Sequence, residues 1–132
     1  MDSSHCTDPG APQTHEAQGL VEDIAEISTY KTGQGKAAIV IFTDIFGYAF
    51  PNARKLADRL AAAVGATVLI PDCFNGDPVD ADDPNRSEKM PQWRERHPTS
   101  NSCAIADKLI STIKGHYDSI QVNFSYYSII SN

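Results

Sequence analysis

The sequence lacks the features that mark several large classes of protein. Its 11 lysines and arginines are outnumbered by 17 aspartates and glutamates, and the net charge of −6 argues against nucleic acid as a partner. No apolar run reaches the ~20 residues that a membrane-spanning helix requires. The N-terminal stretch "MDSSHCTDPGAPQTHEAQG" has neither a basic start nor an apolar core, so it is not a secretory signal. We therefore expect a cytoplasmic protein without a membrane partner.

Cysteine and histidine are too few and too scattered to indicate a metal centre or a disulfide framework. The three cysteines cannot all pair, and we expect reduced thiols. His5, Cys6 and His15 could meet near the N-terminus, but their spacing is looser than that of known metal sites. The sequence also has no G-x-G-x-x-G and no G-x-x-x-x-G-K-[ST] motif. We expect neither a metal nor a nucleotide cofactor.

Two apolar runs carry the strongest structural signal. "AAIVIF" and "ATVLI" are bounded by loop residues, which is typical of strands that are covered on both faces of a parallel sheet. Between them, apolar residues recur with helical spacing over 52–64. The pattern predicts parallel strands at 38–42 and 67–70, joined by a right-handed helical crossover.

The flanking segments complete a parallel βαβαβ core. Residues 1–20 are rich in small and polar residues, and we expect a flexible N-terminal lead. Partial alternation near 22–30 predicts an antiparallel strand at the edge of the sheet. Helical spacing predicts a second helix at 103–114, and "SIQVNF" predicts a third parallel strand at 119–123.

The long, proline-rich stretch from Asp72 to Ser102 is typical of a lid or binding loop. "SEKMPQWRER" within it has room for a short helix. We expect Trp93 to pack in the core or the lid, and Cys73 to be a small buried hydrophobe at the end of a strand.

Polar residues follow both central strands. Ligands of open α/β sheets bind beyond the carboxyl ends of the strands, so the segments Asp44–Tyr48 and Asp72–Asn75 both face the expected site. Position alone leaves two interpretations of Asp44 open. It is either a turn carboxylate that accepts backbone N–H bonds or a functional acid.

The strings "VIFTDIFGYAFPNARKLADRLA" and "TVLIPDCFNGDP" resemble the dienelactone hydrolase family, above all its eukaryotic branch related to carboxymethylenebutenolidase. "MPQWRERHPTSNSCAIADKLISTIK" is similar to the loop and helix that follow in that family. The resemblance extends over roughly residues 5–122. It implies an α/β-hydrolase fold and a Cys–His–Asp triad that cleaves enol lactones and related esters without metal or cofactor.

The resemblance also suggests roles for residues of this chain. It implies that Asp44 is an accessory acid that regulates the nucleophile, and that the backbone N–H of Ile45 donates to the oxyanion. We expect Phe46, Tyr48 and Phe74 to line the binding site, with a small lactone or ester as ligand. The predicted cleft holds Asp44, Ile45 and Phe74, with parts of residues 77–98 above it.

The match ends after the third predicted strand. The family continues with the turn G-x-C-x-G-G, whereas this sequence reads "NFSYYSIISN". Ser125 or Tyr126 falls at the nucleophile position, and the neighbours of Ser125 there, Asn123 and Tyr127, are too large for so strained a turn. No residue matches the triad aspartate or histidine. We therefore expect a non-matching tail at 125–132.

The sequence thus predicts a truncated α/β-hydrolase domain over residues 21–124 that is inactive by itself. Its uncovered sheet edge invites pairing with another chain. One alternative is a non-enzymatic domain that binds a small molecule or a partner through the same core. Another is a flavodoxin-like domain, which the small number of buried strands and the lack of a phosphate-binding loop disfavour.

Overall fold

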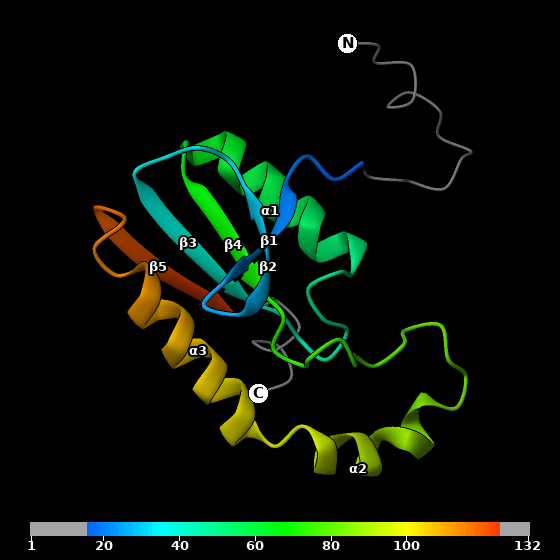
Figure 1. The fold of residues 1–132 in the computed structure, drawn as a ribbon. Coiled ribbons are helices and arrows are strands. Elements are labelled where there is room, and N and C mark those ends of the chain that lie inside the picture. The colour runs from blue at the N-terminus through cyan, green and yellow to red at the C-terminus, as the bar shows by residue number, and fades with distance from the viewer. Residues whose placement is uncertain (1–15, 125–132) are drawn as a thin grey trace, which may run out of the picture.

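The structure is a computed structural model that describes residues 16–124. It contains a mixed five-stranded sheet with helices on both faces (Figure 1). The elements, in chain order, are β1 (Leu20–Ile24), β2 (Ile27–Thr32), β3 (Ala37–Phe42), α1 (Pro51–Val64), β4 (Thr67–Pro71), α2 (Arg86–Arg96), α3 (Thr99–Ile113) and β5 (Ser119–Phe124). The strand order across the sheet is β1-β2-β4-β3-β5.

The central strands form the predicted parallel unit. β3 pairs in parallel with β4 on one side and with β5 on the other, and α1 and α3 are the crossover helices. The three predicted strands each lie within one residue of the observed bounds at either end. The helix predicted at 103–114 begins earlier, at Thr99, and ends at Ile113. The short helix predicted within the long irregular stretch is α2.

The antiparallel pairing predicted at this edge of the sheet is confirmed, but the segment near 22–30 forms two strands instead of one. The chain reverses at Ala25 and Glu26, whose φ angles are 54° and 67°, so the segment forms the hairpin of β1 and β2. β1 lies at the edge, whereas β2 pairs with both β1 and β4. Hairpin turns with positive φ usually contain Asn or Gly, and an Ala-Glu turn gives no such sequence signal.

The two faces of the sheet bury alternate side chains of β3. Ile39 and Ile41 belong to the apolar cluster that α1 covers. Val40, between them, packs with Leu109 and Ile113 of α3. This arrangement explains why β3 is an unbroken apolar run, because a strand covered on both faces needs apolar residues at every position.

Because β3 and β4 are parallel and are joined by the α1 crossover, their carboxyl ends lie at the same edge of the sheet. α1 ends at Val64, and the left-handed backbone of the next residue, Gly65 (φ 68°), lets the Gly65 N–H donate to the carbonyl of Ala61 at 2.9 Å. The arrowheads of β3 and β5 point toward the side of the molecule on which α2 lies (Figure 1).

β5 forms the other edge of the sheet. Within residues 16–124 it pairs with β3 alone, and Val122 and Phe124 are 42% and 62% exposed. Self-association through this edge stays a prediction. No helix among the described residues is long and apolar enough to span a membrane.

Candidate functional site

A cavity of about 520 Å³ opens at the carboxyl ends of β3 and β4. Residues that come after β3 in the sequence form one wall, a residue of the loop after β4 forms a second, and the rest of the lining comes from the end of α2 and the start of α3. Its lining residues are Thr43, Asp44, Ile45, Phe74, Trp93, Arg94, His97, Thr99 and Ser102. The cavity therefore lies where ligands of open α/β sheets bind.

The structure brings together three of the five predicted site residues. Asp44, Ile45 and Phe74 line the cavity, and residues of the 77–98 segment line it with them. Phe46 and Tyr48 do not line it. The Phe46 ring stacks on Phe50 with centroids 5.3 Å apart, and Tyr48 packs against the cluster that α1 covers. The predicted roles of all five residues stay predictions.

Asp44 does serve in a turn, as one of the two interpretations expected. Its Oδ1 accepts the N–H of Phe46 at 3.1 Å, and its carbonyl accepts the N–H of Gly47 at 3.1 Å. Within residues 16–124, Oδ2 accepts no hydrogen bond. Because the residue also lines the cavity, the turn holds one carboxyl oxygen in place and leaves the other uncommitted.

Ile45 and Thr43 flank Asp44, and each has an unpaired polar atom. The Ile45 carbonyl accepts the N–H of Val79 at 2.8 Å, but its own N–H donates no hydrogen bond within residues 16–124. The Thr43 hydroxyl oxygen is buried and also lacks a partner there. Buried polar groups are normally paired, so the buried, unpaired hydroxyl of Thr43 beside a cavity indicates a place for a bound group.

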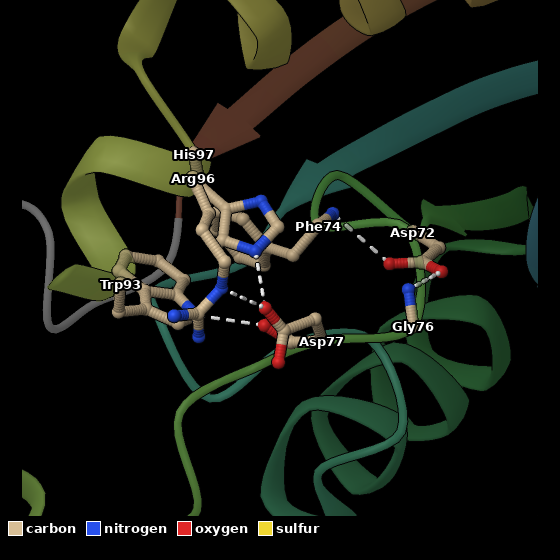
Figure 2. Close-up of polar contacts among 7 residues, drawn as sticks. All are labelled: Asp72, Phe74, Gly76, Asp77, Trp93, Arg96 and His97. Atoms are coloured by element: carbon tan, nitrogen blue, oxygen red, sulfur yellow. Dashed lines mark hydrogen bonds and ion pairs between the residues drawn. The ribbon is translucent and has the colours of Figure 1, made fainter. Parts of the chain in front are cut away.

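The loop after β4 is shaped by Asp72. Its two carboxyl oxygens accept the N–H of Phe74 at 3.0 Å and the N–H of Gly76 at 2.7 Å (Figure 2). These bonds close a tight turn in which Asn75 has a positive φ of 49°. Asp72 is therefore a turn carboxylate that sets the position of Phe74.

Sequence reasoning missed a histidine–carboxylate pair at the other wall of the cavity. His97 Nε2 lies 2.7 Å from Asp77 Oδ2, and Arg96 Nε binds the same oxygen at 2.9 Å (Figure 2). The Trp93 indole N–H donates to the Asp77 carbonyl at 2.7 Å. The hydrogen bond from His97, and then that from Arg96, lower the pKa of Asp77 below its usual value. These contacts fasten the loop to α2.

Three rings form the aromatic part of the wall. The Trp93 ring centroid lies 5.0 Å from that of Phe74 and 4.9 Å from that of His97. The His97 side chain is only 7% exposed. The spacing of Trp93 and His97, four residues apart at the end of a possible helix, was the one sequence signal for this wall. Nothing in the sequence indicated that Asp77 would join them.

Cys73 is buried, as expected. Burial, and then the nearby charge of Asp72, raise the pKa of its thiol to about 12. The thiolate is the reactive form of cysteine, so Cys73 is a poor nucleophile at neutral pH. The nucleophile position at Ser125 or Tyr126, together with His5, Cys6 and His15, lies outside the described residues. Among residues 16–124 no group of three or more acidic, histidine or cysteine side chains is arranged to hold a metal ion.

Comparison with known families identifies the fold around this cavity. The model of the dienelactone hydrolase family matches residues 24–122, which include β2 to β4, the first four residues of β5 and every residue of the cavity. The chain belongs to the dienelactone hydrolase family. The resemblance found in the sequence motifs is thereby confirmed.

Three relatives each match a larger share of this chain than of their own length. Hydrolase pyvD of Aspergillus violaceofuscus is 35% identical over 71% of this chain and 39% of its own length. The endo-1,3;1,4-beta-D-glucanase of Zea mays is 32% identical over 83% of this chain and 35% of its own length. The carboxymethylenebutenolidase homolog of Mus musculus is 39% identical over 47% of this chain and 24% of its own length. The chain thus spans less than two-fifths of each relative.

A solved structure supports the fold. The crystal structure of a protein assigned as a dienelactone hydrolase from Klebsiella pneumoniae superposes with a TM-score of 0.55 and 22% identity. The superposition covers 74% of this chain and 43% of the other. The fold is that of the α/β hydrolases, as predicted.

Proposed function

We propose that this chain supplies the oxyanion side and the lid side of an ester or lactone hydrolase. The observation that carries the proposal is the register of β3 and β5. Phe42, the last residue of β3, pairs with Phe124, the last residue of β5. A catalytic turn that follows β5 would therefore begin beside Thr43, Asp44 and Ile45, at the edge of the cavity.

The chemistry of acyl transfer fits this placement. A nucleophile on such a turn attacks the ester carbonyl, and the carbonyl oxygen takes up negative charge. The unpaired Ile45 N–H is suited to stabilise that charge, and a preorganised donor of this kind is worth about 3 kcal/mol in the transition state. Asp44 lines the same cavity, and its carboxyl oxygen Oδ2, which the turn does not use, suits an accessory acid that acts on the nucleophile.

Residues 1–132 by themselves hold no complete set of catalytic groups under this proposal. The sequence has no G-x-C-x-G-G turn and no residues that match the triad aspartate and histidine. Cys73 is excluded as a nucleophile because its thiol is buried and its pKa is raised. We expect residues 1–132 to hydrolyse neither dienelactone nor p-nitrophenyl acetate above the buffer rate.

Two assays test the proposal. The first measures hydrolysis by purified residues 1–132 whose folding is checked by circular dichroism; turnover that Ser125→Ala or Cys73→Ala abolishes would overturn the expected inactivity. The second joins residues 1–122 to the C-terminal part of a family member, from its G-x-C-x-G-G turn onward. The fusion should hydrolyse esters, and a folded fusion without activity would contradict the proposed role of this half.

The unpaired polar groups also suit a second candidate, a domain that binds a lactone or ester without turning it over. The two candidates differ in the fusion experiment. A binding domain would take up the ligand with or without the added half, and the fusion would remain inactive.

A further inference from the structure

The two ring nitrogens of His97 have different surroundings. Nε2 faces Asp77, whereas Nδ1 points away from it (Figure 2). Within residues 16–124, Nδ1 has no hydrogen-bond partner. His97 also lines the cavity that holds Asp44 and Ile45.

The partner of Nε2 determines what Nδ1 can do. The Asp77 carboxylate is an acceptor, and Arg96 donates to the same oxygen, so the proton of the neutral His97 ring is held on Nε2. Nδ1 then carries a lone pair and accepts a hydrogen bond. Nδ1 is not fully buried, so in the free protein it is accessible to water, and a ligand with a donor group can take the place of that water.

The surroundings of this acceptor narrow the kind of ligand. Phe74 and Trp93 provide ring faces and edges beside His97, which suits a flat aromatic group. Asp44 and Arg94 line the same cavity with opposite charges, so the cavity as a whole favours neither an anionic nor a cationic ligand. A hydroxyl group on an aromatic ring fits these surroundings. The ring packs beside Phe74 and Trp93, and the hydroxyl donates to Nδ1 without adding a charge.

We propose that His97, oriented by Asp77, is a specificity residue that selects ligands with a hydroxyl group on an aromatic ring. The inference rests on the proposed function, since it names the class of ester or lactone that the cavity accepts, namely one derived from a hydroxylated aromatic compound. His97 binds that hydroxyl group and takes no part in the acyl transfer.

Two substitutions separate the acceptor from the clamp. Glutamine places its amide N–H near the position of Nε2, so His97→Gln retains the bond to Asp77 and removes the acceptor. Asparagine reaches only the position of Nδ1, so His97→Asn loses the bond to Asp77. The side chain of Trp93 reports on both variants, because it is the only tryptophan of the chain and its ring lies 4.9 Å from that of His97.

The binding experiment uses ¹⁵N-labelled residues 1–132, with the Trp93 indole N–H resonance as the readout. Phenol and methoxybenzene are the probes, because they have the same ring but only phenol donates a hydrogen bond. Phenol should bind roughly three- to tenfold more tightly than methoxybenzene, which is the contribution of one neutral hydrogen bond. In His97→Gln that ratio should fall to about one while the indole resonance of the free protein stays near its original position.

Four results would overturn the inference. These are no binding of phenol, equal binding of the two probes by the original chain, a preference that persists in His97→Gln, and tighter binding of benzoate than of phenol, which would instead indicate a carboxylate site at Arg94. One further measurement needs no variant: at a pH where the imidazole is neutral, its two-bond ¹H–¹⁵N correlations should show the proton on Nε2, and a neutral ring with the proton on Nδ1 would refute the inference. The fusion assay measures ester hydrolysis and uses neither probe. A failure of the proposed function can therefore be distinguished from a failure of this inference.

Discussion

Phe42 of β3 lies opposite Phe124 of β5 in the parallel ladder, with the two ring centroids 5.9 Å apart. This pair fixes where the two strands end relative to each other. Thr43, Asp44 and Ile45 follow Phe42 at once and line the cavity. The position of the cavity is thus set by strand register, and the groups that line it are set by the turns after β3 and β4.

The buried hydroxyl of Thr43 gives the first prediction. Its oxygen has no partner among the described residues, and an unpaired buried hydroxyl costs stability. Thr43→Val keeps the shape and removes the hydroxyl, so the free energy of unfolding should stay the same or rise by about 1 kcal/mol. Urea unfolding measures this change. A loss of more than about 1 kcal/mol would show that the hydroxyl is paired in the folded protein.

The second prediction concerns pH. Hydrogen bonds from His97 and Arg96 hold the pKa of Asp77 below its usual value of 3.8. For a carboxyl group with a lowered pKa, the stabilisation is complete above the unfolded-state pKa and is lost as the pH falls through the folded-state pKa. Asp77→Asn should therefore destabilise the protein at pH 7, and the difference should shrink below about pH 4.

Acid and neutral unfolding curves of the two proteins test this pH dependence. Asp80→Asn is a suitable control, because the side chain of Asp80 bonds only within its own turn. A difference between Asp77→Asn and the original chain that is the same at pH 3 and at pH 7 would show that the carboxylate charge of Asp77 contributes nothing.

The third prediction compares two thiols. Cys73 is buried and its pKa is raised to about 12, whereas Cys103 on α3 is exposed. Iodoacetamide reacts with the thiolate, so at pH 8 Cys103 should be alkylated and Cys73 should react only in denaturant. Peptide mass spectrometry distinguishes the sites. Equal labelling of both in the folded chain would show that the turn after β4 opens readily.

The sequence was informative wherever a single segment determined its own structure. The runs at β3 and β4 and the helical spacing of α1 predicted the parallel unit, because burial on both faces forces a continuous apolar pattern. The break at Ala25 and Glu26 escaped notice because neither residue type favours positive φ.

The same distinction between local and long-range determinants holds for the residues of the site. The strand-end rule predicted that Asp44, Ile45 and Phe74 share a cavity, because each lies within three residues of the carboxyl end of a strand. The pairing of Asp77 with His97 escaped prediction, because it joins residues 20 positions apart through a loop whose path no local pattern specifies. Tyr48 was assigned to the binding site by proximity in sequence, but the turn after Asp44 directs it toward α1.

The central claim is that the backbone of Ile45 forms the oxyanion side of a hydrolase site. The most direct measurement is kcat for ester hydrolysis by the fusion of residues 1–122 with a family C-terminal part, comparing Ile45→Pro with Ile45→Val. Proline removes the N–H but keeps the carbonyl that binds the Val79 N–H, whereas valine keeps both. The account predicts that kcat falls about a hundred- to a thousandfold in Ile45→Pro and changes little in Ile45→Val. A folded Ile45→Pro fusion with unchanged kcat would contradict it.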